Sequence, residues 1–407
     1  MKLIYNLGIL VYTAIAGVVS LFNHKARLLV NGRKNWYEML KQKIDPGSDY
    51  IWIHCASLGE FEQGRPVIET IKKEKPDLKI VLSFFSPSGF EIRKNYPLAD
   101  IICYLPSDTP GNAKKFIDLI DPVFVIFVKY EFWYNFLSTL KRKGTPLYLI
   151  SAIFREDQPF FRWYGTFFLN MLRMFKMIYV QDDQSLELLK MAGMENVVVA
   201  GDTRFDRVAQ IAASAREIKQ LDSFRGNEKL FIAGSSWKPD EEIIARYINS
   251  YPGRMKWVFA PHETDKSNID RLGRLFKVDV VRYSEFSEEK KGARVLIIDN
   301  IGMLSSAYRY AYLVAIGGGF GKGIHNILEA ACWNIPVFFG PEHQKFREAV
   351  DLIAIGGARC YTSYDEFEKI LNNWIDDEIK YKEAAEKAGN YVRKNSGATE
   401  KILKGIL

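Results

Sequence analysis

The sequence predicts an α/β protein with two doubly wound, Rossmann-like domains behind an amino-terminal apolar helix. From residue 50 onward, short β-branched or aromatic runs alternate with amphipathic helical patterns, which is typical of βαβ units and a parallel sheet. The alternation is interrupted by a polar stretch, residues 207–228, and then restarts. A length of 407 residues also exceeds one ordinary hydrophobic core and fits two domains.

Composition places the chain among folded globular proteins, since 48% of its residues are hydrophobic and 26% are charged. Lys and Arg (56) outnumber Asp and Glu (49), and this surplus favours an anionic membrane surface or an acidic substrate, whereas no motif supports nucleic acid. The cysteines show no Cys-x-x-Cys spacing, so we expect buried thiols in a reducing compartment and no zinc site. They are Cys55, Cys103, Cys332 and Cys360.

The first 23 residues are expected to form a retained membrane anchor. Residues 3–22 carry no charged side chain. A helix of that length, at about 1.5 Å per residue, is about 30 Å long, close to the thickness of a bilayer's hydrocarbon core. Only Lys2 precedes the segment, while several basic residues follow it, so the positive-inside rule keeps the rest of the chain in the cytoplasm. The basic residues are Lys25, Arg27, Arg33 and Lys34.

Two alternatives apply to this segment. Ala14-Ile15-Ala16 would suit signal peptidase, which would make the segment a removed leader. Polar side chains would instead suit a helix that lies in the membrane interface or packs on the protein. These side chains are Asn6, Tyr12, Thr13 and Ser20. The absence of disulfide-like cysteine usage argues against export, so the anchor is favoured.

The first Rossmann-like domain is predicted to span residues 24–206. Its strands are expected at 51–55, 80–84, 101–104, 123–128, 147–151, 177–180 and 197–200. Its helices are expected at 64–73, 87–95, 111–120, 132–142 and 183–191. Residues 207–228 follow as a polar, helical hinge.

The second domain is predicted to span residues 229–385. Its strands are expected at 230–233, 256–260, 278–282, 295–298, 313–316 and 336–339. Each is followed by a turn or a helix, so a second doubly wound sheet results. Residues 386–407 are expected to form a helix that crosses back to the first domain.

The first strand stops abruptly in Ser57-Leu58-Gly59-Glu60. Ser57 suits the N-cap of the next helix, and Glu60, three residues on, would complete a capping box by reaching back to the Ser57 backbone N–H. The alternative places the Glu60 carboxylate at the carboxyl end of a parallel strand, where open α/β sheets bind ligands. On pattern alone the capping role is favoured.

A glycine-rich run from Gly317 to Asn326 follows a predicted strand. Its glycines would bring backbone N–H groups close to a ligand at a helix N-terminus, and phosphate is the expected ligand. The spacing matches neither a Rossmann GxGxxG nor a Walker loop, which disfavours dinucleotides and ATP. An empty strand-to-helix turn is the alternative. A polar cluster favours the ligand site: Lys322, His325, Asn326 and Glu329.

Five motifs occur in the order and approximate spacing of one known family. They are Ser-Leu-Gly-Glu at 57–60, Tyr-Glu-Phe-Trp-Tyr-Asn at 130–135, Gly-Asp-Thr-Arg-Phe-Asp at 201–206, Gly-Ser-Ser at 234–236 and the glycine-rich run that continues as Ile-Leu-Glu-Ala-Ala to residue 331. The chain resembles a 3-deoxy-D-manno-octulosonic acid (Kdo) transferase, from its first apolar residues to about residue 390. The resemblance implies a GT-B glycosyltransferase, with two Rossmann-like domains facing a cleft.

The resemblance further implies transfer of Kdo from CMP-Kdo to a lipid A precursor in lipopolysaccharide biosynthesis. The enzyme would lie on the cytoplasmic face of the inner membrane, with the membrane surface as a partner and no cofactor besides the donor substrate. Such a transfer needs a base on the acceptor hydroxyl and stabilisation of the leaving phosphate. Glu60 is the expected base for an inverting reaction, and Glu131 is the second expected catalytic residue.

Further site residues follow from the same motifs. Donor-binding residues are expected to be Arg204, Gly234, Ser235, Ser236, His262, Gly318, Gly319, Lys322, His325, Asn326 and Glu329. Acceptor-binding residues are expected to be Ser57, Gly59, Lys129 and Arg162. Arg204 would hold the Kdo carboxylate or pair with a neighbouring aspartate, and the ion pair is slightly favoured. His262 would meet the CMP phosphate or lie in a loop without a ligand.

The sequence departs from the family pattern at several positions. Trp237 stands in place of a histidine, His262 in place of an arginine and Lys129 in place of a glutamate, while Ile324 replaces a glycine and Ile327 a proline. The aromatic and Met-rich segment 160–176 suits a membrane interface or, equally, a buried helix with a basic edge.

The sequence also bears on a metal requirement and on two alternative functions. No Asp-x-Asp pair occurs, so no metal requirement is expected. A GT-B transferase that uses a UDP- or GDP-sugar is one alternative, disfavoured because Val337 stands eight residues after Glu329, where many of these enzymes have a second glutamate. A membrane-tethered nucleotide-binding module without catalysis is the other alternative.

Overall fold

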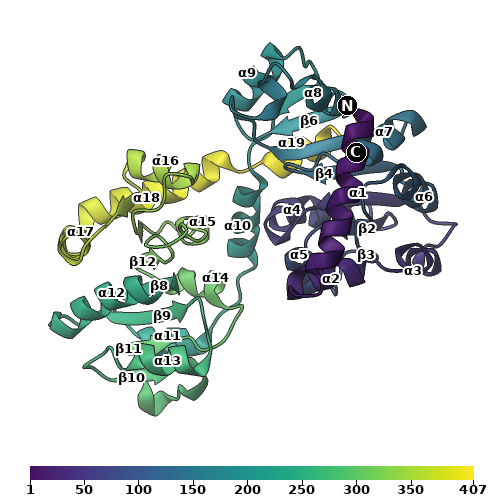
Figure 1. The fold of residues 1–407 in the computed structure, drawn as a ribbon. Helices are drawn as coiled ribbons and strands as arrows, with labels where there is room; N and C mark the ends of the chain where they lie inside the picture. Colours follow the sequence, from purple (N-terminus) through teal and green to yellow (C-terminus); the bar gives the residue numbers. More distant parts are fainter. The chain divides into compact units, whose positions relative to one another are not determined.

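The computed structural model describes residues 1–407, and the chain folds into two compact units (Figure 1). The first domain consists of Met1–Arg207 together with Ser396–Leu407, and the second domain consists of Val208–Asn395. Each domain holds one seven-stranded sheet, and every pair of neighbouring strands is parallel. This is the doubly wound α/β class that the alternating pattern predicts.

The sheet of the first domain has the order β3-β2-β1-β4-β5-β6-β7. Strand order reverses between β1 and β4, which makes their carboxyl ends the switch point at which such sheets bind ligands. The strands are β1 (Tyr50–Cys55), β2 (Lys79–Phe84), β3 (Ile101–Tyr104), β4 (Phe124–Val128), β5 (Leu147–Ala152), β6 (Met177–Val180) and β7 (Val197–Val199). All seven coincide with the predicted strands to within one residue at each end.

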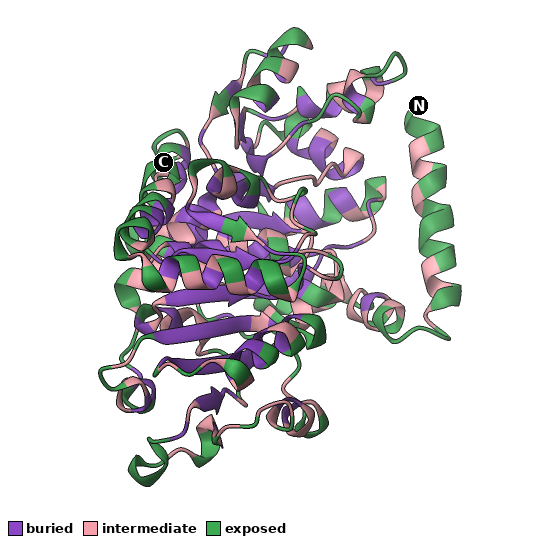
Figure 2. Ribbon diagram, turned by 90° about the vertical axis from the view of Figure 1, so that its left-hand side faces the viewer, coloured by how far each residue is buried: buried purple, intermediate pink, exposed green.

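Hydrophobic cores cover both faces of this sheet. Ile51 and Ile53 of β1 pack on one face together with Ile402 near the end of the chain. Trp52, between them, packs on the other face against Phe116. Since both faces are covered, the central strands β1 and β4 are buried along their whole length (Figure 2), which explains why they read as continuous apolar runs rather than alternating ones.

The helices of the first domain precede β1, connect successive strands or follow β7. They are α1 (Lys2–Val19), α2 (His24–Gly32), α3 (Trp36–Lys43), α4 (Leu58–Glu74), α5 (Pro87–Arg93), α6 (Pro110–Ile120), α7 (Tyr134–Lys143), α8 (Thr166–Leu172), α9 (Asp183–Met191), α10 (Thr203–Ser214), which continues into the second domain, and α19 (Ala398–Lys404). The helix expected at 64–73 begins earlier, because the Ser-Leu-Gly-Glu turn is itself the first turn of α4.

The sheet of the second domain has the order β10-β11-β9-β8-β12-β13-β14. Its strands are β8 (Leu230–Ser236), β9 (Lys256–Pro261), β10 (Val280–Arg282), β11 (Val295–Ile297), β12 (Leu313–Ile316), β13 (Val337–Phe339) and β14 (Ala358–Cys360). The sequence pattern missed β14, because this three-residue edge strand contains the exposed Arg359 and gives no apolar run. The order reverses between β8 and β12.

The helices of the second domain are α11 (Lys219–Arg225), α12 (Lys238–Ser250), α13 (Lys266–Gly273), α14 (Leu304–Ala307), α15 (Leu328–Ala331), α16 (Arg347–Ile355), α17 (Tyr364–Asp376) and α18 (Glu378–Asn395). The stretch 207–228 is largely helical, because it holds the end of α10 and all of α11. The chain then returns to the first domain, where α19 adds Ile402 and Leu403 to the core beside α4.

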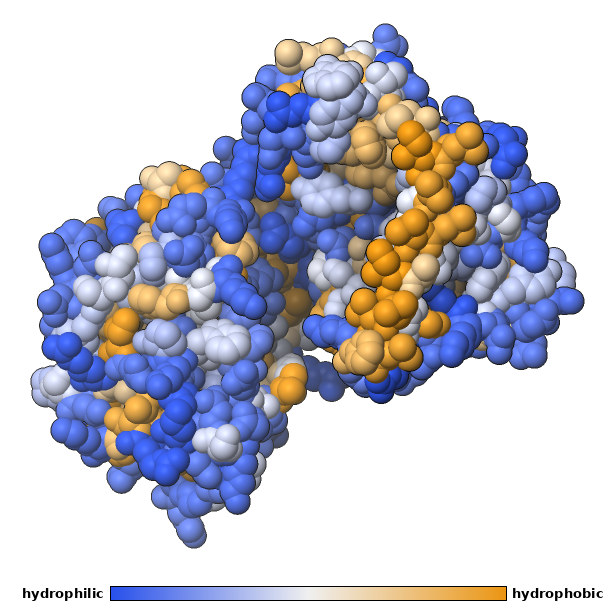
Figure 3. Space-filling model, viewed as in Figure 1, coloured by the Kyte–Doolittle hydropathy of each residue, from blue (hydrophilic) through white to orange (hydrophobic).

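Helix α1 packs on the first domain by its polar edge. Tyr5 and Asn6 bond to residues of the domain, as does Thr13, whose hydroxyl lies 3.3 Å from that of Ser107. The opposite side of α1 is an exposed apolar stripe (Figure 3). It includes Leu3, Ile4, Leu7, Leu10, Val11, Ile15 and Val18. By length and composition α1 is the one helix here that could cross a membrane.

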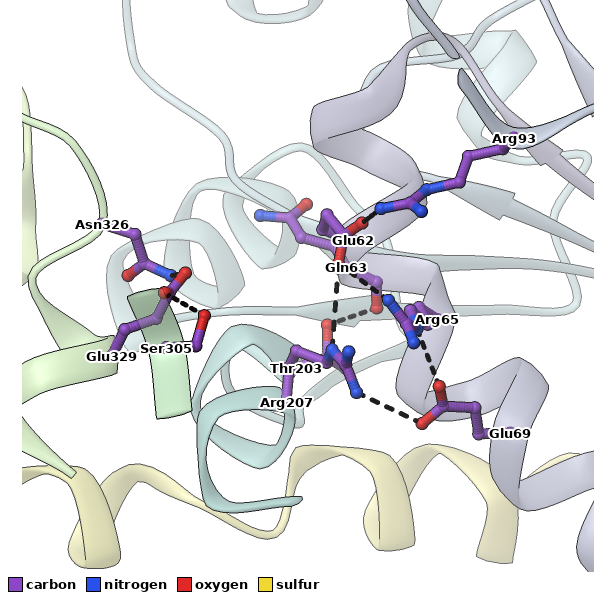
Figure 4. A network of polar contacts seen from close by, with 10 residues as sticks. All are labelled: Glu62, Gln63, Arg65, Glu69, Arg93, Thr203, Arg207, Ser305, Asn326 and Glu329. Atoms are coloured by element: carbon purple, nitrogen blue, oxygen red, sulfur yellow. Dashed lines mark hydrogen bonds and ion pairs between the residues drawn. The ribbon is translucent and has the colours of Figure 1, made fainter. Parts of the chain in front are cut away.

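The motif at 201–206 joins distant parts of the first domain. Thr203 donates its hydroxyl to the carbonyl of Gln63 on α4 at 2.6 Å (Figure 4), and the same hydroxyl oxygen lies 3.1 Å from that of Ser151 in β5. Asp206 accepts three bonds at the start of α19, from the backbone N–H groups of Gly397 and Thr399 and from the Thr399 hydroxyl. This motif therefore holds the returning end of the chain in place.

We expect Asp206→Ala to lower the free energy of unfolding of the full chain by about 2 kcal/mol, because it removes a charged cap from the first turn of α19. Urea unfolding followed by circular dichroism measures the loss, and hydrogen exchange should show faster exchange in α19. Glu400→Ala is the matched control, because Glu400 lies in the same helix and pairs with Lys404 only at the exposed surface. Equal effects of the two substitutions would contradict the capping role.

Candidate active site

The turn between β1 and α4 places a carboxylate at the carboxyl edge of the first sheet. Ser57 is the extended N-cap of α4, and Glu60 lies in the first helical turn. The expected capping box is wrong, because the Ser57 side chain accepts no bond from the helix backbone and its hydroxyl donates to the Glu60 carboxylate instead. A charge-assisted bond of this kind is stronger than the neutral cap that it replaces. Glu60 is half-buried and so is both held and reachable.

Glu131 lies close to the same strand end. β4 pairs with β1 on the side opposite β2, so the residues after β4 emerge beside the residues after β1. Burial raises the pKa of the Cys55 thiol at the end of β1 well above its ordinary value, and the negative charges of Glu60 and Glu131 raise it further. Both expected catalytic carboxylates therefore lie within electrostatic range of one thiol.

A buried hydrogen-bond chain fixes Glu131. His54, on β1, places Nε2 3.0 Å from a Glu131 carboxylate oxygen and Nδ1 2.8 Å from the Ser83 hydroxyl. Trp52 donates its indole N–H to the same hydroxyl at 2.7 Å, and Trp133 donates its own to Glu131 at 2.6 Å. Since an ionised carboxylate only accepts, the network assigns the proton of a neutral His54 to Nε2, with Ser83 donating to Nδ1.

Sequence reasoning missed His54, because it stands inside an apolar strand and reads as core. One signal was available. His54 is fully buried, and a buried polar side chain has to find a hydrogen-bond partner. Its partner lies 77 residues away in sequence, so the local pattern does not reveal it.

The motif at 130–135 also holds α1. Asn135 is buried and donates from Nδ2 to the side-chain oxygen of Asn6 at 2.9 Å and to the Asp108 carbonyl at 2.6 Å. Tyr5 donates its hydroxyl to the Asp108 carboxylate at 2.6 Å and accepts the backbone N–H of Tyr134 at 3.2 Å. The motif that contains Glu131 therefore also fastens the amino-terminal helix.

The remaining expected acceptor residues lie at the surface or in the loops. Gly59 is exposed in the first turn of α4. Lys129 has a left-handed backbone (φ 71°), and its amine lies 5.5 Å from the ring centre of Tyr130. Arg162 is exposed after a short 3-10 turn. In the aromatic segment 160–176 the inner side is buried, while Trp163 is 93% exposed.

Arg204 forms the ion pair that its spacing favoured. Its Nε and Nη2 each lie 2.7 Å from one carboxylate oxygen of Asp202, and its backbone N–H donates to the other oxygen at 2.9 Å. Asp202 is 7% exposed, so the pair is partly desolvated. One guanidinium edge is therefore engaged within the motif.

The glycine-rich run of the second domain forms a tight loop after β12. Gly317 approaches the Ser235 backbone so closely that a Cβ there would overlap it, and Gly318 is left-handed (φ 94°). Several N–H groups of the loop already donate within the protein, among them those of Gly318 to Asp240 and of His325 to Gly317. The following helix, α15, has only four residues. Fewer backbone N–H groups thus face outward than the sequence suggested.

Three rings gather beside this loop. His262 stacks on Trp237 at 4.7 Å and on His325 at 4.6 Å between ring centres. Trp237 donates its indole N–H to Nε2 of His325 at 3.0 Å, which places the proton of a neutral His325 on Nδ1. Burial lowers the pKa of His325, and the charge of His262 lowers it further. Two of the family departures therefore form one unit with the expected donor-binding histidine.

The Gly-Ser-Ser motif does not form the turn that its sequence suggested. β8 continues through Ser236 with an irregular register, and Ser235 takes a left-handed backbone (φ 49°). Ser236 is 2% exposed and donates its hydroxyl to the buried Glu241 carboxylate at 2.9 Å, which also pairs with Arg271. Gly234 is buried against Tyr308. Burial therefore leaves Ser235 as the accessible member of the motif.

Asn326 and Glu329 form a small cluster on the second domain (Figure 4). Glu329 accepts from the Asn326 amide at 3.0 Å and from the Ser305 hydroxyl at 2.6 Å. Asn326 in turn accepts the backbone N–H of Leu328, the first residue of α15, at 3.2 Å. Lys322 is exposed in the loop nearby in sequence, and Gly319 is buried against Gly340. No group of three or more His, Cys, Asp or Glu side chains is placed to hold a metal ion.

The two parallel sheets define the fold class of the protein. The structure of UDP-N-acetylglucosamine 2-epimerase from Neisseria meningitidis bound to UDP-GlcNAc matches with a TM-score of 0.61 and 14% identity, covering 88% of this chain and 99% of that chain. At this identity the likeness shows the fold alone. The fold is the GT-B architecture of two Rossmann-like domains.

The family follows from sequence comparison. Residues 30–207 match the family model of 3-deoxy-D-manno-octulosonic-acid transferase. The 3-deoxy-D-manno-octulosonic acid transferase of Aquifex aeolicus is 27% identical over 325 residues, 78% of this chain and 83% of that protein. That of Haemophilus influenzae is 24% identical over 379 residues, 88% of this chain and 86% of that protein. The first domain therefore matches the Kdo transferase family of glycosyltransferases, as the motif resemblance predicted.

Asp240 gives the second domain a testable pH dependence. Burial raises the pKa of this carboxyl from 3.8 to about 6, while it accepts the backbone N–H groups of Trp237 and Gly318. Because the folded-state pKa lies above the unfolded one, stability falls as the pH rises from about 4 to about 6, and the loss is complete above that range.

We expect Asp240→Asn to keep both acceptor bonds without the charge. It should raise the free energy of unfolding at pH 8 by about 1–2 kcal/mol and leave it unchanged at pH 4. Urea unfolding of both proteins at pH 4, 6 and 8 measures the difference. A gain of equal size at every pH would contradict the raised pKa of Asp240.

Proposed function

We propose that the chain transfers Kdo from CMP-Kdo to a hydroxyl of a lipid A precursor in one inverting step, with Glu60 as the general base. The placement of Glu60 carries the proposal. Its carboxylate lies in the first turn of α4, at the switch point of the first sheet, and the Ser57 hydroxyl holds one of its oxygens. The other oxygen is left to accept a proton.

The proposed reaction has one bond-forming and one bond-breaking event. Glu60 takes the proton of the acceptor hydroxyl as the hydroxyl oxygen attacks the anomeric carbon of Kdo. The bond between that carbon and the CMP phosphate oxygen breaks, and CMP leaves with the electron pair. Glu131, which His54 and Trp133 fix in place, supplies a second negative charge near the developing oxocarbenium ion.

We assign binding of CMP to the glycine-rich loop of the second domain. Lys322 is exposed there and offers a positive charge to the phosphate. His325 is held by Trp237 so that its Nδ1–H is the donor that remains. The ring stack of Trp237, His262 and His325 offers an aromatic wall for the nucleotide. No cofactor or metal enters the proposed reaction.

The proposed location is the cytoplasmic face of the inner membrane. The apolar stripe of α1 is exposed along the helix, while the polar edge is bound to the first domain. A stripe of this kind is suited to contact lipid tails. Trp163, at the tip of the aromatic segment, is suited to the headgroup region.

The test of this function is the product mass of a tetraacylated lipid A precursor after incubation with purified protein and a CMP-Kdo generating system. A mass gain of one or more Kdo residues is expected. Glu60→Gln should lower the turnover number by about 10² to 10⁴, since a positioned base contributes that much, while CMP affinity by calorimetry is retained. Glu74→Gln is the control, because Glu74 is exposed at the other end of α4.

Two results would reject the proposal. An unchanged lipid mass with the wild-type protein would reject the proposed activity. Wild-type turnover in Glu60→Gln would reject Glu60 as the base. Tighter binding of UDP or GDP than of CMP in the same calorimeter would favour the alternative sugar nucleotides.

Trp237 provides a separate test of the donor site. We expect Trp237→Phe to weaken CMP binding about fivefold, because the ring remains but the bond that orients His325, of about 1 kcal/mol, is lost. Isothermal titration calorimetry measures this. Trp333→Phe is the matched control, because the indole N–H of Trp333 is buried without a hydrogen-bond partner. Equal affinities of wild type and Trp237→Phe would contradict the orienting role.

A further inference from the structure

A buried carboxylate supports the glycine-rich loop of the second domain from inside. Asp240, in the first turn of α12, is 1% exposed. One of its oxygens accepts the backbone N–H of Gly318 in the loop at 3.3 Å and that of Trp237 at 3.1 Å. The other oxygen lies 3.5 Å from the hydroxyl of Tyr361, which follows β14. The carboxylate is therefore bonded directly to the loop to which CMP binding is assigned.

The charge of Asp240 is not balanced by a cation. Its hydrogen-bond partners are all neutral, and the charged side chain next to it on α12 is that of Glu241, which pairs with Arg271. Burial, and to a smaller extent the charge of Glu241, raises the pKa of Asp240 to about 6 against the effect of its hydrogen bonds. The carboxylate is accordingly ionised at pH 8 and mostly protonated at pH 5.

The groups expected to meet the phosphate lie on the same loop. The His325 ring packs on Gly318, since a Cβ on that glycine would lie 3.1 Å from the ring, and Lys322 is exposed. Charges in solvent interact over about 10 Å at moderate salt, and buried charges are screened less. A phosphate held by these two side chains would thus feel the charge of Asp240 through the loop.

The two nucleotides of the proposed reaction differ in charge at this phosphate. In the donor the phosphate is a diester with one negative charge. In released CMP it is a monoester, whose second pKa is about 6, so it carries close to two negative charges at pH 8. Because Coulomb energy is proportional to the charge of the ligand, an ionised Asp240 opposes a phosphate dianion about twice as strongly as a monoanion.

We propose that Asp240 is a specificity-determining residue of the donor site, which weakens binding of the product CMP relative to binding of the donor diester. The residue acts through its charge, without touching the nucleotide. It therefore favours release of CMP after transfer. The inference rests on the proposed function, because that function assigns the phosphate to the glycine-rich loop.

The test compares CMP with its methyl ester, a phosphodiester of one negative charge. Isothermal titration calorimetry of the full-length protein measures both affinities at pH 8 and pH 5. At pH 8, Asp240→Asn should tighten CMP binding about tenfold, because it keeps an oxygen for Gly318 and removes the charge. The methyl ester should gain about threefold, the square root of the gain for CMP. At pH 5 both gains should fall below about twofold, since wild-type Asp240 is then mostly protonated.

Glu242→Gln is the matched control, because it removes a carboxylate from the same helix at an exposed position, where Glu242 lies 3.8 Å from Lys238. It should leave both affinities unchanged. The titration of His262 and His325 is common to all these proteins and cancels in the comparison. Equal gains for the two ligands in Asp240→Asn, or gains of the same size at pH 5, would overturn the role of the charge. Gains in Glu242→Gln that match those of Asp240→Asn would overturn the assignment to Asp240.

The outcome is separable from that of the proposed function. Discrimination between CMP and its methyl ester through Asp240, in a protein that transfers no Kdo, would support this inference and reject the proposed reaction. Kdo transfer by a protein whose Asp240→Asn variant binds both ligands as the wild type does would do the reverse. Absence of CMP binding by the wild-type protein at both pH values would overturn the inference together with the donor site. Circular dichroism of each variant at both pH values should match the wild type.

Discussion

The pairing of β1 between β2 and β4 is the constraint on which the first domain depends. Because parallel neighbours end at the same edge of the sheet, this pairing brings together the residues that follow three separate strands. Glu60 follows β1, Phe85 follows β2 and Glu131 follows β4. The carboxylates at the switch point and the aromatic ring of Phe85 are thus brought to one edge by the strand order.

Around this edge, polar groups inside the domain serve to position other groups. His54 is fully buried and fixes Glu131 from within β1. Asn135 and Asp108 hold α1 through Asn6 and Tyr5, so the amino-terminal helix is tied to the same loops that surround the site. The exposed apolar stripe of α1 is consequently held on the first domain by the loops at this edge of the sheet.

In the second domain, two residues that depart from the family pattern, Trp237 and His262, lie in one cluster. Trp237 donates a hydrogen bond to His325, and His262 stacks on both rings, so the two substituted residues and His325 form one ring cluster. The serine at 236 and the glycine at 318 support this arrangement from inside, through Glu241 and Asp240. Fewer polar groups of the Gly-Ser-Ser motif and of the glycine-rich loop are therefore accessible than their sequences suggest.

The sequence by itself determined the two sheets, every strand except the short edge strand β14 to within a few residues, and the family resemblance, because hydrophobic periodicity and motif order can be read from the sequence alone. It predicted the turn in which Glu60 lies, but the predicted hydrogen bond from the Ser57 backbone N–H to Glu60 is wrong. Only the tertiary structure decided that Ser57 donates to it, that His54 meets Glu131 across 77 residues and that Asn6 meets Asn135 across 129. Contacts of that span depend on strand order and side-chain direction, which no local pattern encodes.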